Sequence, residues 1–301
     1  MFEHEYKLQY PVYTLDNIEL LPAGTILLEG ESGELITLKK GPRTSTVRLF
    51  DYGSIKKDIL DFISQPPYNV IFSNREQVDS MLELMGMSEL KSPILECLDY
   101  FRGADFYTYR HMLVVFALSI FLGQELLKED LDLMNAAFSS PAHDFGKICV
   151  PLEILKKTDP LTEKERQLLE HHTLAGYVLL KYYNVNELSA RIARDHHERK
   201  NGSGYPAGIT LKDRLVEIVV VSDIYDALIS PRPYRQKSYD NRTAIEEISS
   251  KAERGEIGWD VVKALVACNR KSKPHYSDCH VSGEKRGTPP PNNAHGITAE
   301  E

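Results

Sequence analysis

Apolar residues recur at intervals of three and four positions from about Ser92 to Arg270, and this spacing restricts the fold more than any other feature. It places the apolar side chains along one face of an α-helix. The clearest stretches are YRHMLVVFALSIFLGQELLKED, LTEKERQLLEHHTLAGYVLLKYY and YDNRTAIEEISSKAERG. We therefore predict a mainly α protein whose residues 96–270 form an all-helical bundle.

Local signals locate some of the helix boundaries. Thr162 followed by Glu165 has the pattern of a capping box, and Pro93 suits the first turn of a helix. The stretch RLVEIVVVSDIYDALIS is ambiguous, because its β-branched residues are typical of strands. We predict a helix there, because the apolar face extends through Asp226-Ala227-Leu228 and exceeds the length of a strand.

Both ends of the chain differ from this helical part. Residues 1–75 contain short apolar runs separated by turn residues, which predicts strands, and residues 76–98 read as helix and connector. We therefore predict a smaller α+β domain over residues 1–95. Residues 271–301 are rich in Pro, Gly and Asn and nearly lack apolar residues, which predicts a disordered tail. We interpret the metal-binding residue types in this tail as incidental; they are His275, Cys279 and His280.

Bulk properties limit the classes of function. A net charge of −8 argues against a general nucleic-acid-binding protein, which needs a broad basic surface. The four cysteines are widely spaced, which suits a reducing compartment rather than a disulfide framework. The N-terminus lacks the pattern of a signal peptide, and the longest apolar run, Met112–Leu122, is shorter than the roughly 20 residues of a membrane span. We expect a cytoplasmic protein that binds no membrane.

Histidine and aspartate are concentrated in the predicted bundle. Imidazole and carboxylate together suit Fe, Mn, Zn or Ni rather than Mg or Ca. Each residue alone has a structural alternative: His111 as a core histidine, His143-Asp144 as a turn, and Asp223 in a buried salt bridge with Arg214 or Arg191. Their joint occurrence in one helical domain favours a metal site. The candidates are His111, His143-Asp144, His171-His172, His196-His197 and Asp223.

Four motifs occur in an order and spacing that resemble the HD-GYP domain. They are HDFGK, LEHHTLAGYVLL, DHHERKNGSGYPAG and VVVSDIYDALISPRPYR, and the resemblance covers roughly residues 96–270. HD-GYP domains are metal-dependent phosphohydrolases of bacterial signalling that typically hydrolyse the second messenger cyclic di-GMP. The resemblance therefore implies an enzyme with a binuclear centre of two transition-metal ions, iron or manganese.

The same resemblance implies seven metal ligands: His111, His143, Asp144, His172, His196, His197 and Asp223. Of the adjacent pair at 171 and 172, His172 matches the motif because Gly176 follows it, which leaves His171 as a surface or supporting residue. We expect Asp144 to bridge the two ions. One ion would then be bound by His111, His143 and Asp223, and the other by His172, His196 and His197.

The resemblance also implies a mechanism. Two cations about 4 Å apart can hold a bridging hydroxide as the nucleophile, with Asp144 as the bridging carboxylate. We expect Lys147 to neutralise charge on the phosphorus oxygens. Arg232 and Arg235 are expected to bind the second phosphate, and Tyr205 to contact a base or a phosphate. The structural alternatives are a solvated loop for the two arginines and a packing role for Tyr205.

Four positions depart from the family pattern. Tyr107 stands where members with a third metal ion have glutamate, so we expect two ions. Asn201 replaces an aspartate, Thr173 replaces a proline, and Pro141 lies where a helix interior is usual. Tyr107, Asn201 and Pro141 keep open an alternative function, a weakly active or inactive receptor that binds metal and cyclic di-GMP and signals through protein contacts. A third reading is a different nucleotide hydrolase. We expect the N-terminal domain to be regulatory, or to contact a protein partner or a second copy of the chain.

Overall fold

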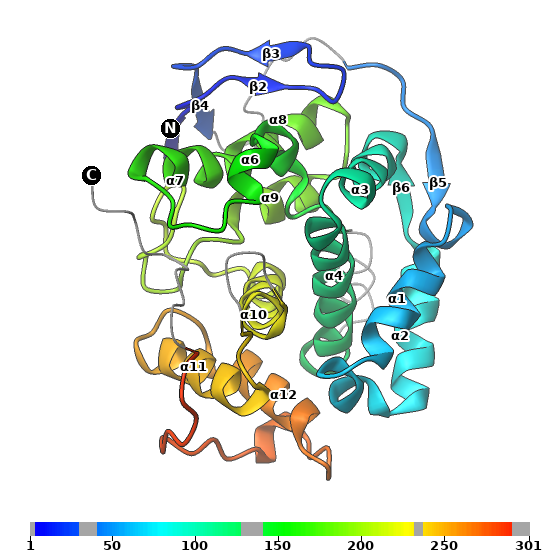
Figure 1. Cartoon of the computed structure of the whole chain (residues 1–301), viewed down its shortest axis with the longest axis vertical. Helices are drawn as coiled ribbons and strands as arrows, with labels where there is room; N and C mark the ends of the chain where they lie inside the picture. The colour runs from blue at the N-terminus through cyan, green and yellow to red at the C-terminus, as the bar shows by residue number, and fades with distance from the viewer. Residues whose placement is uncertain (1–3, 30–40, 128–140, 232–236, 291–301) are drawn as a thin grey trace.

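The computed structural model describes residues 4–29, 41–127, 141–231 and 237–290 (Figure 1). Helices make up most of this part, which confirms the prediction of a mainly α fold. The longer helices are α1 (Ile55–Ser64), α2 (Arg75–Met87), α3 (Ser92–Ala104), α4 (Phe106–Leu126), α7 (Glu163–Glu170), α8 (His172–Tyr182), α9 (Glu187–Asp195), α10 (Arg214–Ile229), α11 (Asn241–Glu253) and α12 (Trp259–Asn269). Short helical turns are η1 (Leu49–Asp51), η2 (Tyr68–Ser73), η3 (Phe145–Cys149), α6 (Leu152–Leu155) and η4 (Tyr276–Asp278).

In the described part of the chain, six short strands form three antiparallel pairs at the periphery. The strands are β1 (His4–Lys7), β2 (Val12–Tyr13), β3 (Glu19–Leu21), β4 (Ile26–Glu29), β5 (Thr46–Arg48) and β6 (Glu89–Lys91). β1 pairs with β4, β2 with β3, and β5 with β6. In Figure 1 the first two pairs cover the end of the molecule that contains α8, and β2 contacts α8. The described strands therefore form three separate two-stranded sheets rather than one larger sheet.

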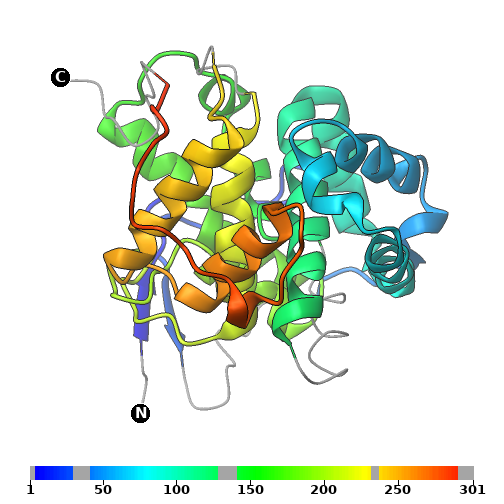
Figure 2. The same cartoon turned by 90° about the horizontal axis from the view of Figure 1, so that it is seen from below.

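The central helix of the molecule is α4, which packs against α10 on one side and against α2 and α3 on the other (Figures 1 and 2). Its sequence is apolar on nearly all faces, which is the pattern of a helix buried on every side. Among the described residues, α4 alone has the length and composition of a membrane-spanning helix, yet 83% of its most apolar window is buried inside the molecule. We therefore interpret α4 as the core helix of the bundle.

The local helix signals of the sequence are confirmed. Thr162 Oγ1 accepts a hydrogen bond from Glu165 N at the start of α7, and Glu165 Oε2 accepts one from Thr162 N at 2.7 Å. Pro93 lies in the first turn of α3. The ambiguous stretch forms α10, because Asp213 Oδ1 accepts from Leu215 N at 2.9 Å and buried neighbours surround the β-branched side chains.

The prediction of strands over residues 1–75 is wrong for its last third. Residues 55–64 form α1, and residues 68–73 form η2. Ile55, Ile59 and Ile63 are buried on one face of α1, which packs against α4. Their four-residue spacing was the sequence signal of this helix.

The hydrophobic core is continuous across the boundary predicted at residue 95. One cluster of buried apolar residues extends from Tyr6 to Cys279. α1 and α2 pack against α4, so the N-terminal residues and the bundle share a core. A separate regulatory role of residues 1–95 stays a prediction.

Residues 271–290 differ from the expectation of a disordered tail. They run across α11 and α12 (Figure 2), and Cys279 is buried. Glu246 Oε2 accepts hydrogen bonds from Arg286 N at 3.0 Å and Gly287 N at 2.8 Å. Hydrogen bonds of this kind hold a segment that has few apolar side chains. Residues 291–301 lie outside the described part of the chain.

Candidate metal centre

The seven predicted metal ligands come together from five segments of the chain. α4 contributes His111, the turn before η3 contributes His143 and Asp144, and α10 contributes Asp223. His172 is the first residue of α8, and His196 and His197 follow the end of α9. Six of the seven side chains are buried, and His197 is partly buried.

Three of these side chains form a first group, which consists of His111, His143 and Asp223. One ligand atom of each lies within 4.8 Å of the other two. The Nε2 atom of His111 is 3.1 Å from Asp223 Oδ1. The donor set is two imidazoles and a carboxylate, which suits a transition-metal ion.

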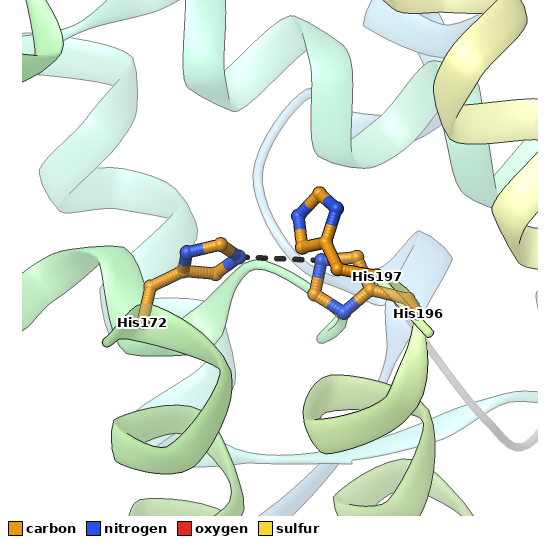
Figure 3. A group of neighbouring side chains, drawn as sticks. All are labelled: His172, His196 and His197. Carbon is orange, nitrogen blue, oxygen red and sulfur yellow. Dashed lines mark hydrogen bonds between the residues drawn. The ribbon is translucent and has the colours of Figure 1, made fainter. Parts of the chain in front are cut away.

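His172, His196 and His197 form a second group of the same size. Figure 3 shows their rings directed toward a common point from the ends of α8 and α9. The Nε2 atoms of His172 and His196 are 3.3 Å apart. Adjacent residues within a helix point about 100° apart, and the position of His196 and His197 just beyond α9 allows both rings to face His172.

Asp144 lies between the two groups, and its two carboxylate oxygens face different groups. Asp144 Oδ2 is 3.4 Å from both His111 Nε2 and His143 Nε2. Asp144 Oδ1 is 3.4 Å from His172 Nε2 and 3.8 Å from His196 Nε2. One carboxylate therefore stands within reach of anything bound at either group.

Two glycines bring this carboxylate close to α8. A Cβ atom on Gly146 would lie 1.9 Å from the carbonyl oxygen of His172 and 2.3 Å from Gly176 N, which is far inside van der Waals contact. Only glycine lets η3 approach the first turn of α8 this closely. Gly146 therefore allows Asp144 to lie beside His172.

The outer nitrogens of three imidazoles are held by oxygen atoms of the protein. His172 Nδ1 is 2.5 Å from Leu169 O, and His196 Nδ1 is 3.0 Å from Ala193 O. His111 Nδ1 is 2.7 Å from Asp226 Oδ2. An oxygen at this position holds the proton on Nδ1, so each Nε2 presents its lone pair to the interior of the site.

The protonation of the site also suits a metal. Burial lowers the pKa of His172 to about 4 and that of His196 to about 3, so both imidazoles are neutral at pH 7. Burial opposes ionisation of Asp144, but the positive charge of Lys147 helps to outweigh it and hold the pKa of Asp144 well below its usual value. Within the described residues, His143 Nε2 is buried without a hydrogen-bond partner. The neutral imidazoles of His172 and His196 and the ionised carboxylate of Asp144 are in the protonation states that a metal ion requires of its ligands.

The substrate-contacting residues predicted from the sequence are only partly described. Lys147 Nζ is 2.6 Å from Asp144 Oδ2, at the edge of the first group. Tyr205 stacks on His197 with ring centroids 4.6 Å apart, so one face of its ring is covered by a predicted ligand. Arg232 and Arg235 lie outside the described residues.

Glu198 acts on the loop after His197 rather than on a histidine. Its Oε1 atom accepts hydrogen bonds from Ala207 N at 2.7 Å and Gly208 N at 3.1 Å. Gly204 permits this fold, because a Cβ there would lie 2.3 Å from His197 O. The carboxylate of Glu198 therefore fixes the loop that carries Tyr205.

Two other expectations are corrected. Asp223 does not form the alternative salt bridge, because Arg191 pairs with Asp213 and Arg214 pairs with Glu217 and Asp260. His171 is buried against the ring of Tyr10 and belongs to neither group of ligands.

Pro141 lies where a helix interior is usual in the family, and here it precedes a turn. His143 and Asp144 lie in that turn.

Sequence reasoning missed Asp226. It lies three residues after Asp223 on α10 and contacts His111 from the side opposite Asp223. The available signal was a second carboxylate within the same apolar run, which has the same cost of burial as the first.

Comparison with known proteins now identifies the family. Residues 73–261 match the family model of the HD domain, which is more than half of the chain. The chain belongs to the HD domain family. It falls in the HD-GYP group of that family. The match begins at residue 73, the last residue of η2, which is ahead of the predicted boundary at residue 95.

Curated relatives of this HD-GYP protein include several phosphodiesterases. It is 39% identical over 148 residues to a cyclic di-GMP phosphodiesterase of Thermotoga maritima, which covers 47% of this chain and 39% of that protein. A cyclic di-GMP phosphodiesterase of Pseudomonas aeruginosa is 36% identical over 151 residues, covering 49% and 36%. A 3'3'-cGAMP-specific phosphodiesterase of Vibrio cholerae is 29% identical over 154 residues, covering 50% and 36%. The chain thus spans less than half the length of these relatives.

Proposed function

We propose that this HD-GYP protein is a metal-dependent phosphodiesterase that hydrolyses cyclic di-GMP. The observation that carries the proposal is the placement of Asp144, whose two oxygens face two separate groups of ligands. A carboxylate in this position suits a bridge between two ions. The names of the relatives supply the substrate class, since they include phosphodiesterases for cyclic di-GMP.

The proposed centre contains two transition-metal ions, iron or manganese. The first group with Asp144 Oδ2 would hold one ion, and the second group with Asp144 Oδ1 would hold the other. Bound ions would supply Lewis-acid activation of the phosphodiester and of the attacking water. Two ions rather than three are favoured because Tyr107, which replaces the glutamate of three-metal members, is stacked on the ring of His111 at 5.8 Å.

The protein's own residues would bind and orient the substrate. Lys147 places an ammonium group beside Asp144, where a phosphate oxygen approaching both groups of ligands would gain a charge-assisted hydrogen bond. One face of the Tyr205 ring stacks on His197, so the opposite face is the one that would meet a guanine base. Arg232 and Arg235 are proposed to bind the second phosphate.

The proposal is tested by incubating the Mn²⁺-loaded or anaerobically Fe²⁺-loaded protein with cyclic di-GMP and separating the products by chromatography. We expect metal-dependent conversion to the linear dinucleotide or to GMP, and no conversion after chelation. Parallel reactions with 3'3'-cGAMP test the substrate, because one relative is specific for that compound. The matched control is Asp144→Asn, which preserves size and removes the charge.

Three other outcomes would contradict the proposal. Intact cyclic di-GMP together with measurable binding would favour the receptor that the sequence left open. Faster cleavage of 3'3'-cGAMP than of cyclic di-GMP would make 3'3'-cGAMP the preferred substrate. Cleavage only of mononucleotides would favour a different nucleotide hydrolase.

We also propose a cellular location and a class of partner. All four cysteines are free, as in proteins of reducing compartments, which supports a cytoplasmic location. A protein partner or second copy at the N-terminal residues stays a prediction, and fractionation with sizing of the purified chain would test both.

A further inference from the structure

Asp226 connects the metal centre to a part of the chain far from it in sequence. Its Oδ2 atom is 2.7 Å from His111 Nδ1, and its side chain is fully buried. It therefore decides which nitrogen of His111 carries the proton. Whatever holds Asp226 also holds His111.

Tyr68, from η2, is one of the groups that hold Asp226. Its hydroxyl donates to Asp226 Oδ1 and lies 3.0 Å from Ser230 Oγ. Arg110 completes the contact, with one guanidinium nitrogen 2.7 Å from the Tyr68 hydroxyl and another 3.5 Å from Asp226 Oδ1. The ring of Tyr68 is 1% exposed and lies beneath the guanidinium of Arg110.

The chemistry of this cluster favours Tyr68 as a donor. Burial and the negative charge of Asp226 raise the pKa of Tyr68 well above its usual value, so its hydroxyl keeps its proton. A phenol that donates to one carboxylate oxygen restricts rotation of that carboxylate, and the other oxygen then stays aligned with His111 Nδ1. Removing the hydroxyl would leave Asp226 Oδ1 with the ion pair to Arg110 at 3.5 Å, which is longer than an ordinary hydrogen bond and holds the carboxylate less firmly.

Contacts outside the centre fix the position of η2. Lys273 Nζ is 2.5 Å from Val70 O and 3.2 Å from Ile71 O, and it also donates to Cys268 O at the end of α12. η2 is therefore attached to the C-terminal part of the bundle through Lys273. Tyr68 therefore belongs to a turn that is held in place by hydrogen bonds from Lys273.

We propose that Tyr68 is a positioning residue of the metal centre, acting through Asp226 to fix the orientation of His111. The N-terminal segment then completes the centre in addition to covering the bundle. This inference rests on the proposed metal centre, and it goes beyond it by assigning a role to a residue that touches neither metal nor substrate.

The test compares Tyr68→Phe with Tyr109→Phe in the full chain. Tyr109 is an equally buried tyrosine whose hydroxyl donates to Asp58 Oδ2 at 2.6 Å, and it likewise joins the bundle to the N-terminal segment without touching Asp226. Mn²⁺ binding is measured by isothermal titration calorimetry and by metal content after gel filtration. We expect Tyr68→Phe to weaken one class of Mn²⁺ site by about 10- to 100-fold, the usual effect of losing a group behind a metal ligand. The Mn²⁺ affinity of the other class of site should change by less than about threefold, as expected for a site that does not contact the substituted residue.

A second variant keeps the test decisive if Tyr68→Phe is poorly folded. Asp226→Asn keeps an acceptor for His111 but lacks the charge, and it should weaken the same class of site. Equal losses in Tyr68→Phe and Tyr109→Phe would overturn the inference, because attachment of the N-terminal segment would then be the cause. Wild-type affinity in both Tyr68→Phe and Asp226→Asn would overturn it while leaving the proposed function intact. Absence of Mn²⁺ binding in the wild type would overturn both.

Discussion

Asp144 is the residue on which the geometry of both ligand groups depends. It is shared by them, while Lys147 contacts the same carboxylate from the outer side. The two residues are three positions apart, yet they have different roles in the proposed enzyme. Asp144 would bridge the two ions, and Lys147 would present positive charge to the substrate.

Substitution separates these roles. Asp144→Ala is expected to abolish stoichiometric Mn²⁺ binding, because each group loses a ligand. Lys147→Ala should keep its Mn²⁺ and lower kcat by about 10²- to 10³-fold, which is typical for loss of one group that stabilises developing charge. Metal analysis of both purified variants, followed by turnover of cyclic di-GMP, checks the expectation. Equal loss of metal in the two variants would contradict it.

The resemblance of the motifs predicted which seven side chains come together, but not the groups behind them. These predicted ligands belong to residue types with few roles inside a helical core, so their joint occurrence was informative. Asp226 and Asp223 look alike in a sequence, and only the side of His111 that each contacts distinguishes them. The contact of Tyr68 with Asp226 joins residues 158 positions apart, and no local pattern reports such a pair.

At the scale of elements, the loop after α9 depends on one buried carboxylate. Glu198 Oε1 accepts hydrogen bonds from the backbone amides of Ala207 and Gly208, and no apolar side chain could replace these contacts. The capping box of α7 and the length of α10 were readable from the sequence, because both are set by neighbours in the chain. The fold of the 198–208 loop was not, because it depends on an acceptor nine and ten residues away.

Removing that acceptor should loosen the loop. In Glu198→Ala the amide protons of Ala207 and Gly208 are expected to exchange at least about tenfold faster, since a hydrogen bond to a charged group contributes roughly 1.5–3 kcal/mol. Glu198→Gln retains a carbonyl acceptor and should lie between this variant and the wild type. Hydrogen exchange followed by mass spectrometry or NMR measures the effect. Unchanged exchange in Glu198→Ala would show that other contacts hold the loop.

At the scale of the whole molecule, both ends of the chain pack on the bundle. The core extends from Tyr6 to Cys279, and Lys273 joins the C-terminal segment to η2. Composition indicated a disordered C-terminal tail because polar contacts of this kind leave no apolar pattern. The helical class itself was readable, since it follows from periodicity over the long middle part of the chain.

Truncation measures what the C-terminal segment contributes. A chain ending at Arg270 loses the Lys273 hydrogen bonds and the buried Cys279, and we expect its midpoint of thermal unfolding to fall by several degrees. A change of about 2–4 °C per kcal/mol is usual for a domain of this size. A chain ending at residue 290 keeps these contacts and is the control, with an expected midpoint like that of the full chain. Equal midpoints for all three chains would mean that the segment adds no stability.

The near contact of Gly146 with Gly176 has a consequence for how such sequences can diverge. At Gly146 the neighbouring backbone leaves no space for a methyl group, and at Gly176 a methyl group would lie a tight 3.1 Å from Gly146 N. No residue larger than glycine can therefore replace Gly146 as long as η3 stays against α8. A lineage that gained bulk there would have to part the two segments, and Asp144 would then recede from His172. We therefore expect replacement of Gly146 to occur together with loss of the predicted ligands in related sequences.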